Sequence, residues 1–326
     1  MPGNPVSYDS IFSIKSAADF NAAALSVFRH QYLENKVYRQ FCDLLQTNPD
    51  LVKNYRQIPF LPIQFFKSHP VISNARTAQT VFYSSGTTKS NLSEHHVADL
   101  SLYDQSLLNG FELAFGPVSD YSIFALLPSY HANKNASLLY MVDKLIEISG
   151  NAGGFFLENH VDLITQIKTA QTSKKVILIG VSYALLDLAD SLAPDLKDII
   201  VLETGGMKGR RKEMLKSELH DHLKAKFNVA AIGSEYGMTE LLSQAWSRGN
   251  GVFHCPPWMK VLTREYNDPL SFTENKTGGI NVIDLANLHS CSFIATQDLG
   301  IVNENGFEIT GRFDNADLRG CNLLIQ

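Results

Sequence analysis

The sequence lacks several features that would assign it to a specialised class of protein. Its four cysteines stand far apart and form no Cys-x-x-Cys pair, so neither a disulfide framework nor a zinc cluster is indicated. No sustained run of Lys and Arg interrupts a chain of net charge −5, which argues against nucleic-acid binding. Apolar runs such as 123–128 are far shorter than the ~20 residues of a membrane span, and the N-terminus lacks the parts of a signal peptide. We therefore expect a cytoplasmic protein without a membrane span.

The chain does contain enough apolar material for a hydrophobic core. It has 326 residues, of which 44% are hydrophobic and 19% charged, as in ordinary globular proteins. A capping signal at 16–19, followed by apolar residues at helical spacing, predicts two helices over 16–46. Two prolines in the segment 58–63 predict an extended connector without regular structure. Residues 1–75 are thus predicted to be a helical lead-in and a connector.

Residues 76–233 alternate short β-rich runs with helical stretches, such as 181–192 and 208–227. Apolar strands joined by helices are typical of a mainly parallel sheet whose faces the helices cover, and we predict an α/β core here. Residues 234–326 carry shorter runs and a hairpin turn at 303–306, which predict a small antiparallel β-subdomain and a tail. The predicted strands are 81–83, 122–127, 176–179, 199–202 and 229–232 in the core, and 278–283, 291–295, 300–302 and 307–310 in the subdomain.

A loop rich in hydroxyl groups follows the first predicted strand. Residues 83–90 read Tyr-Ser-Ser-Gly-Thr-Thr-Lys-Ser, so side-chain hydroxyls stand on both sides of a glycine that lets backbone amides approach an anion. The loop suits a polyphosphate, although it lacks the spacing of a Walker loop. Taken alone, it is equally compatible with an ordinary Ser/Thr-rich turn. The candidate phosphate-binding residues are Ser84, Ser85, Gly86, Thr87 and Thr88.

A second segment, Gly-Ser-Glu-Tyr-Gly-Met-Thr-Glu at 233–240, follows the last predicted core strand. Tyr236 offers a flat ring for a purine, and Thr239 can donate a hydrogen bond to a phosphate. Glu240 can hold Mg²⁺ through hard oxygen ligands. The structural alternative is a turn and a helix start with an acidic residue in its first turn.

A third segment combines Thr-Gln-Asp-Leu-Gly at 296–300 with Gly-Arg-Phe-Asp at 311–314. The carboxylate of Asp298 can accept hydrogen bonds from both hydroxyls of a ribose. Arg312 is always charged and can contact a ribose or phosphate oxygen. As isolated residues, the two are also compatible with a turn aspartate and a surface arginine.

In this order the three segments resemble the adenylate-forming superfamily of acyl-CoA synthetases, luciferases and peptide-synthetase adenylation domains, over residues 58–321. The resemblance implies the large N-terminal domain of that fold and a reaction in two steps. A carboxylate attacks the α-phosphate of ATP, pyrophosphate leaves, and a nucleophile captures the mixed anhydride. Catalysis of the first step rests mainly on positioning and charge stabilisation.

The resemblance also implies a role for each candidate residue, with ATP and Mg²⁺ as cofactors. Residues 84–88 would hold the β- and γ-phosphates, and a glycine-rich loop at 203–206 would lie along the adenine. The remaining roles are Gly205 and Gly206 in that loop, Tyr236 stacked on adenine, Thr239 at the α-phosphate, Glu240 on Mg²⁺, Asp298 and Arg312 on the ribose, and His131 near the acyl carboxylate.

The end of the chain, 311–322, resembles the close of the LuxE-like acyl-protein synthetases, which lack the C-terminal lid domain of the superfamily and its catalytic lysine. In that family a cysteine near the C-terminus takes the acyl group from the adenylate and passes it to a fatty-acyl reductase. Cys321 occupies that position, and a thiolate attacks an acyl anhydride readily. Because the lid lysine is missing and the phosphate loop lacks its usual Gly-x-Pro-Lys ending, Lys89, Lys134, Lys208 or a partner would have to supply that cation.

The implied partners are a small-molecule carboxylic acid, with a fatty acid as the leading candidate, and an acyl-accepting reductase or carrier protein. The sequence leaves a homo-oligomer open. Three other functions stay open as well: a catalytically silent nucleotide-binding scaffold or regulator, a CoA ligase, and a serine esterase. The last rests on Gly-Val-Ser-Tyr-Ala at 180–184, where Ser182 stands as in a nucleophile elbow but Ala184 replaces the second glycine.

Overall fold

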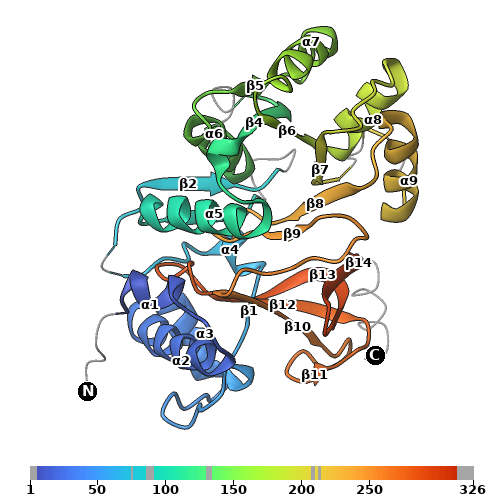
Figure 1. The fold of residues 1–326 in the computed structure, drawn as a ribbon. Helices are drawn as coiled ribbons and strands as arrows, with labels where there is room; N and C mark the ends of the chain where they lie inside the picture. Colours follow the sequence, from blue (N-terminus) through green and yellow to red (C-terminus); the bar gives the residue numbers. More distant parts are fainter. Residues whose placement is uncertain are drawn as a thin grey trace. The chain divides into compact units, whose positions relative to one another are not determined.

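The computed structural model describes residues 6–74, 76–85, 92–129, 134–206, 210–211 and 214–313. The chain divides into two compact units, and this division does not follow the three predicted segments. Unit 1 comprises Met1–Arg76 together with Pro257–Gln326, and unit 2 comprises Thr77–Pro256. The predicted lead-in therefore belongs to the same unit as the C-terminal strands. Figure 1 labels most of the helices and strands of both units.

Unit 1 begins with helices whose ends are fixed by capping side chains. The hydroxyl of Ser16 accepts a hydrogen bond from the backbone N–H of Asp19 at 3.1 Å, and α2 (Ala17–Glu34) starts there. Asn35 ends that helix and caps α3 (Lys36–Leu44). The prediction of two helices over 16–46 is confirmed. The short helices α1 (Tyr8–Phe12) and α4 (Phe65–Ser68) complete the helical part of unit 1.

The sheet of unit 1 has the strand order β1-β13-β12-β10-β11, with β14 paired to β13. Its neighbours are antiparallel except for β1 and β13, which are parallel. The predicted hairpin turn is confirmed, because Asn303 pairs with Gly306. The bounds are β1 (Leu61–Pro62), β10 (Met259–Arg264), β11 (Phe272–Thr273), β12 (Gly278–Asp284), β13 (Phe293–Asn303) and β14 (Gly306–Arg312).

Two sequence predictions in unit 1 need correction. The connector 58–63 was predicted to lack regular structure, yet Leu61–Pro62 form an edge strand that pairs with Ile294 and Ala295. An edge strand tolerates a proline because it has no hydrogen-bonding neighbour on one side. The predicted strands 291–295 and 300–302 are parts of one long strand, β13, which runs through the Asp-Leu-Gly segment without interruption.

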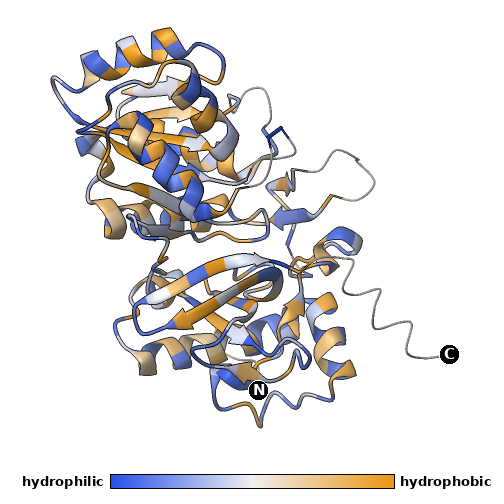
Figure 2. Ribbon diagram, turned by 90° about the vertical axis from the view of Figure 1, so that its right-hand side faces the viewer, coloured by the Kyte–Doolittle hydropathy of each residue, from blue (hydrophilic) through white to orange (hydrophobic). Residues whose placement is uncertain are grey.

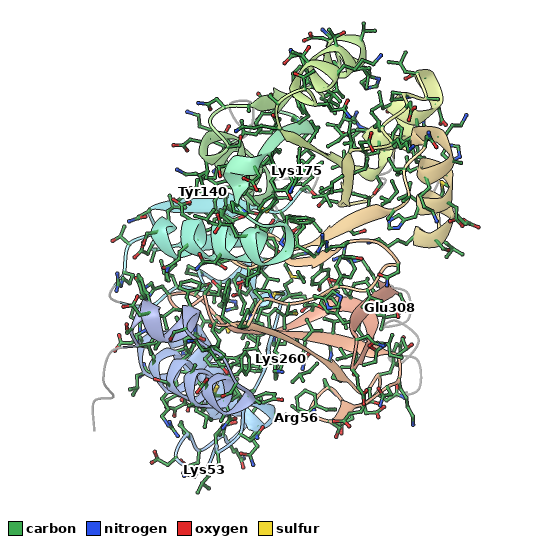
Figure 3. The ribbon with its side chains drawn as sticks, in the orientation of Figure 1. Lys53, Arg56, Tyr140, Lys175, Lys260 and Glu308 are labelled. Atoms are coloured by element: carbon green, nitrogen blue, oxygen red, sulfur yellow. The ribbon has the colours of Figure 1, made fainter. Side chains whose placement is uncertain are left out.

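A buried glutamine joins the lead-in helices to the strands of unit 1. The amide nitrogen of Gln31 on α2 donates to the backbone oxygens of Asn287 and Leu288 and to the hydroxyl of Ser292, each at 3.0 Å. Its oxygen accepts from the N–H of Ser292. Lys260 of β10, labelled in Figure 3, places its ammonium over the ring of Phe20 on α2 at 5.2 Å. These contacts explain why residues 1–76 share a unit with residues 257–313.

The sheet of unit 2 has the order β5-β4-β6-β7-β8-β9; the strands from β5 to β8 are parallel, and β9 is antiparallel. A hairpin of β2 and β3 lies outside this sheet. The strands are β2 (Thr80–Tyr83), β3 (Glu94–Val97), β4 (Tyr121–Leu126), β5 (Gly153–Phe155), β6 (Lys175–Val181), β7 (Ile200–Thr204), β8 (Ile232–Tyr236) and β9 (Ala245–Ser247). The helices are α5 (Leu100–Phe115), α6 (Ser137–Ile148), α7 (His160–Ala170), α8 (Ser182–Ser191) and α9 (Lys216–Phe227).

The connections of this sheet define where a ligand can bind. From β4 the chain runs through α6 to the edge strand β5, whereas from β6 it runs through α8 in the opposite direction to β7. Open α/β sheets bind ligands outside the carboxyl ends of the strands at such a reversal point. All residues of β4 are buried, and Figure 2 colours the strands of this sheet mainly as hydrophobic. The predicted mainly parallel sheet with helices is confirmed.

One strand boundary in unit 2 differs from the prediction in a way that affects the site. The sequence placed the last core strand at 229–232, but β8 runs from Ile232 to Tyr236. The polar residues Ser234 and Glu235 are therefore strand residues at its carboxyl end and not part of a turn. Their polarity hid the strand, because strand prediction relies on apolar runs.

Candidate active site

Asp298 and Arg312 lie opposite each other in the ladder of β13 and β14, as cross-strand partners in unit 1. The Nε atom of Arg312 is 3.1 Å from Oδ1 of Asp298, and the Arg312 side chain is 72% exposed against 12% for Asp298. The N–H of Asp298 donates to the hydroxyl of Thr296 at 3.1 Å. The pair thus presents a fixed carboxylate and an accessible guanidinium side by side, as the binding of ribose and phosphate oxygens requires.

A buried arginine that sequence reasoning missed supports this strand. Arg264 on β10 donates through Nη1 to the backbone oxygen of Ile280 at 2.7 Å and to Oδ1 of Asn281 at 2.8 Å. Its Nη2 donates to the backbone oxygen of Thr296 at 2.6 Å. A Cβ atom on Gly279 would approach the Arg264 guanidinium carbon to 2.5 Å, so glycine is needed there. Arg264 therefore ties three strands together two residues before Asp298.

In unit 2, the predicted phosphate loop lies between β2 and β3 in the sequence. Its base is closed by Ser84, whose N–H donates to the carbonyl of Ser93 at 3.1 Å and whose hydroxyl accepts from the N–H of Ser93 at 2.9 Å. Ser85 is exposed. Gly86, Thr87 and Thr88 lie outside the described residues, as do His131 and Cys321, so their predicted roles stay predictions.

A buried histidine, also missed from the sequence, connects this hairpin to the second predicted segment. His95 on β3 is fully buried and pairs with Phe82 across the hairpin. Its Nδ1 atom is 2.7 Å from the backbone oxygen of Thr239, and because a carbonyl only accepts, Nδ1 carries the proton. One side chain thus links the strand that follows the phosphate loop to the peptide bond between Thr239 and Glu240.

The second predicted segment spans the end of β8 and the turn after it. Tyr236 is buried, with its ring 5.8 Å from the ring of Phe253, and Glu240 is also buried. In the part of the chain that the structure describes, no three metal-binding side chains cluster. Magnesium that binds together with a nucleotide needs only one or two carboxylates besides the phosphates. A single carboxylate at Glu240 is therefore enough for the predicted magnesium site.

The predicted glycine-rich loop follows β7 directly. Gly205 has a φ of +68°, a conformation that favours glycine, and a Cβ on Gly206 would meet nothing within 4 Å. Among the residues that the structure describes, no side chain covers this side of the backbone at Gly206. Such a surface suits a flat base, as the predicted role of both glycines requires.

Glu203, near the end of β7 and directly before Thr204, is a buried carboxylate whose two oxygens both accept hydrogen bonds. Glu203 accepts from the hydroxyls of Ser182 at 2.9 Å and Ser234 at 3.0 Å. The ammonium of Lys216 lies 3.3 Å away and Nε2 of His220 lies 3.7 Å away. Burial alone raises the pKa of Glu203, but the hydrogen bonds and the charge of Lys216 outweigh it, so the pKa is lowered. Glu203 is therefore ionised at neutral pH.

The burial of Ser182 argues against the esterase alternative. It is 2% exposed, whereas the serine of a nucleophile elbow stands exposed at the top of the sheet. Its hydroxyl donates to Glu203 and makes a longer contact of 3.4 Å to the backbone oxygen of Gly205. Ser182 thus holds Glu203 and the start of the glycine loop in place.

The neighbouring glutamate, Glu235 at the end of β8, is held differently. Thr204 donates to its Oε2 atom at 2.6 Å. Burial raises the pKa of Glu235 to about 7, against the lowering effect of that hydrogen bond. Neither glutamate was assigned a role from the sequence, since both owe their surroundings to residues from other helices and strands.

The family model described as "Acyl-protein synthetase, LuxE" matches residues 10–326. This chain belongs to the LuxE family of acyl-protein synthetases. It is therefore a ligase-class enzyme, as the resemblance of its C-terminal segment predicted. The long-chain-fatty-acid–luciferin-component ligase of Vibrio harveyi is 23% identical to it over 329 residues, covering 92% of this chain and 85% of that protein.

Solved structures agree with the LuxE fold assignment. The structure of 2-hydroxyisobutyryl-CoA ligase in complex with 2-HIB-AMP and CoA superposes on this chain with a TM-score of 0.69 at 12% identity. The superposition covers 93% of this chain and 72% of the ligase chain. ATP-bound MatB from Rhodopseudomonas palustris superposes over 71% of this chain with a TM-score of 0.54 at 17% identity, and this chain spans 47% of the MatB chain. At these identities the likeness shows a shared fold, that of the adenylate-forming enzymes. In the described residues of the LuxE chain, no helix is long and apolar enough to cross a bilayer.

Proposed function

We propose that this LuxE-family protein uses ATP to activate a carboxylic acid as an acyl-adenylate and transfers the acyl group to a thiol. The observation that carries the proposal is the match of the LuxE family over residues 10–326. The strand ends of unit 2 support it, because Gly205 and Gly206 follow β7, and Tyr236 and Glu240 stand at and after the end of β8, at the carboxyl edge of an open α/β sheet. We place the reaction in the cytoplasm, where ATP is available.

In the first step, a carboxylate oxygen of the acid attacks the α-phosphorus of ATP. The bond from that phosphorus to the bridging oxygen breaks, and pyrophosphate leaves with the electron pair. Because little covalent work falls to the protein, it accelerates this step by orientation and charge stabilisation. In our assignment residues 84–88 hold the β- and γ-phosphates, Tyr236, Gly205 and Gly206 bind adenine, Asp298 and Arg312 bind ribose, Thr239 contacts the α-phosphate, His131 lies near the acyl carboxylate, and Glu240 holds Mg²⁺.

In the second step, the thiolate of Cys321 attacks the acyl carbonyl of the adenylate. The bond to the phosphate oxygen breaks, AMP leaves, and a thioester forms that keeps the acyl group activated. An acyl reductase or a carrier protein then takes the acyl group from Cys321. The Vibrio harveyi relative is named for a long-chain fatty acid, which supports a fatty acyl chain as the substrate class.

Exchange of labelled pyrophosphate into ATP tests the first step directly. We expect exchange that depends on an added carboxylic acid and on Mg²⁺, and we expect the Cys321→Ala variant to retain it while losing covalent acylation. A protein that binds ATP but catalyses no exchange with any acid would instead be a silent nucleotide-binding scaffold. Exchange with a stable product formed only when CoA is present would favour a CoA ligase.

A further inference from the structure

Phe313 stands between the proposed ribose contact and the proposed acyl acceptor in the sequence. It directly follows Arg312, and Cys321 comes eight residues later. The N–H of Phe313 donates to the carbonyl of Gln297 at 2.8 Å, which extends the pairing of β13 and β14 by one residue. Phe313 is therefore held by the sheet of unit 1, and it is the described residue nearest to Cys321 in the sequence.

The ring of Phe313 contacts a second aromatic ring and a guanidinium group. Its centroid is 5.1 Å from that of Tyr266, with 33° between the two ring planes. The guanidinium carbon of Arg264 lies 5.3 Å from the Phe313 centroid. Both kinds of contact are attractive at these distances. Tyr266, Arg264 and Phe313 together form what we call the Phe313 clamp.

Both partners of Phe313 are fixed by the strands that carry them. Arg264 is buried, and its guanidinium group donates to backbone carbonyls of β12 and β13. Tyr266 stands two residues later in the turn between β10 and β11, where the N–H of Glu265 donates to the carbonyl of Ser271 at 2.8 Å. These bonds do not involve Phe313, so the two partners form a rigid seat for its ring.

The clamp lies at the surface, unlike the core contacts of the same hairpin. Tyr266 is 50% exposed, whereas Phe307 on β14 is 2% exposed. An aromatic contact at such a site changes an equilibrium by a factor of about ten at most. A contact of this strength holds a segment in place most of the time and still lets it leave. Those are the properties needed where an acyl group must travel from an adenylate to an acceptor protein.

We propose that Tyr266 is a positioning residue for the second step, the transfer of the acyl group to Cys321. By holding the ring of Phe313, it fixes the point from which the chain runs to that cysteine. The inference rests on the proposed function. Eight residues span at most about 29 Å. A tethered group meets its target at an effective concentration that depends on where its tether begins. Tyr266 has no contact with ATP or the acid in our assignment, so it acts on transfer and not on adenylation.

The test starts from a preformed acyl-adenylate, which isolates the second step. The probe is dodecanoyl-adenylate, and intact-protein mass spectrometry follows the rate at which Cys321 gains the dodecanoyl group as AMP leaves. Tyr266→Ala should slow this rate about five- to tenfold, the factor that an aromatic pair supplies, and leave pyrophosphate exchange and the urea midpoint unchanged. Tyr266→Phe keeps the ring and should keep the wild-type rate. Leu270→Ala, at an exposed position in the same turn, is the matched control.

Proteolysis measures the clamp without any reaction. Trypsin cleaves after arginine, so it can cut between Arg312 and Phe313 and again after Arg319. Cleavage follows the population of the open form, so Tyr266→Ala should be cut before Phe313 about five- to tenfold faster than the wild type. Cleavage after Arg319 is the internal reference and should not change. Phe313→Leu keeps an apolar side chain without the ring and should behave like Tyr266→Ala in both assays.

An unchanged transfer rate in Tyr266→Ala would overturn the inference. With unchanged proteolysis the clamp would hold nothing, and with faster cleavage it would have a structural role alone. Equal losses of exchange and transfer would place its effect on the ribose contact of Arg312, which also contradicts the proposal. A wild type that catalyses exchange but gains no acyl group at Cys321 would instead remove the second step of the proposed function, and this inference with it.

Discussion

The two units hold their candidate residues in opposite ways. In unit 1, Asp298 and Arg312 are cross-strand neighbours on one hairpin, and the arginine is largely exposed. In unit 2, the candidate residues stand at strand ends and are held by side chains from distant parts of the chain. His95 contacts Thr239 across 144 residues of sequence, and Ser182 contacts Glu203 across 21.

This difference predicts how mutations act in the two units. A change in the hairpin pair of unit 1 should weaken ligand binding with little effect on folding, because an exposed ion pair contributes less than about 1 kcal/mol. A change in the strand-end network of unit 2 should affect folding and binding together. The predictions below test that contrast in decreasing order of expected effect.

Glu203→Ala should lower the free energy of unfolding by about 3 kcal/mol, because it leaves a lysine and two hydroxyls without their buried acceptor. Urea denaturation measures the change. Arg312→Ala in unit 1 is the comparison and should cost less than about 1 kcal/mol. Similar losses in both variants would contradict the proposed difference between the units.

Asp298→Ala should weaken ATP binding about 10- to 100-fold, the equivalent of a hydrogen bond to a charged group. Titration calorimetry with ATP and Mg²⁺ measures the affinity. The ATP affinity of Asp298→Asn should lie between those of Asp298→Ala and the wild type. The urea midpoint should stay close to that of the wild type. Unchanged ATP affinity would show that Asp298 does not contact the nucleotide.

His95→Leu should raise the Mg²⁺ concentration for half-maximal pyrophosphate exchange about fivefold, since one hydrogen bond of about 1 kcal/mol no longer positions the Thr239–Glu240 peptide. His95→Asn offers a donor at a similar position and should recover part of the loss. Equal effects of both substitutions would mean that His95 acts by packing alone.

The stability of the protein should depend on pH through Glu235 in a defined direction. Its pKa is raised from 4.5 to about 7 in the folded protein, so its contribution to stability is full below pH 4.5 and is lost as the pH rises through about 7. Glu235→Gln should therefore flatten the decline of the unfolding free energy over that range. Glu203, whose pKa is lowered, should contribute above pH 4.5 and lose its effect on acidification. A Glu235→Gln variant with the wild-type pH profile would rule out this titration.

The sequence predicted the elements whose evidence is local. Caps and helical spacing predicted α2 and α3, and apolar runs predicted β4, β6 and β7. The candidate loops were found because glycine, hydroxyl and acidic residues follow such strands. The edge strand at Leu61–Pro62 was missed because its strand character comes from pairing with Ile294 and Ala295, far along the chain.

The supporting residues of the site could not be predicted in the same way. His95 stands in no recognised motif, and Glu203 and Glu235 stand in the segments 203–206 and 233–240, where the predicted roles fell on other residues. Only the fold shows what each of the three contacts. Polar residues at the end of β8 concealed the strand that carries Glu235. Arg264 resembles any charged strand residue until its three acceptors on neighbouring strands are known.

Intact-protein mass spectrometry after incubation with ATP, Mg²⁺ and a panel of carboxylic acids tests the central claim most directly. We predict that the wild type gains the mass of one acyl group, that hydroxylamine removes it as expected of a thioester, and that Cys321→Ala gains none. An unchanged mass with every acid, together with no pyrophosphate exchange, would contradict the assignment of this protein as an acyl-activating enzyme.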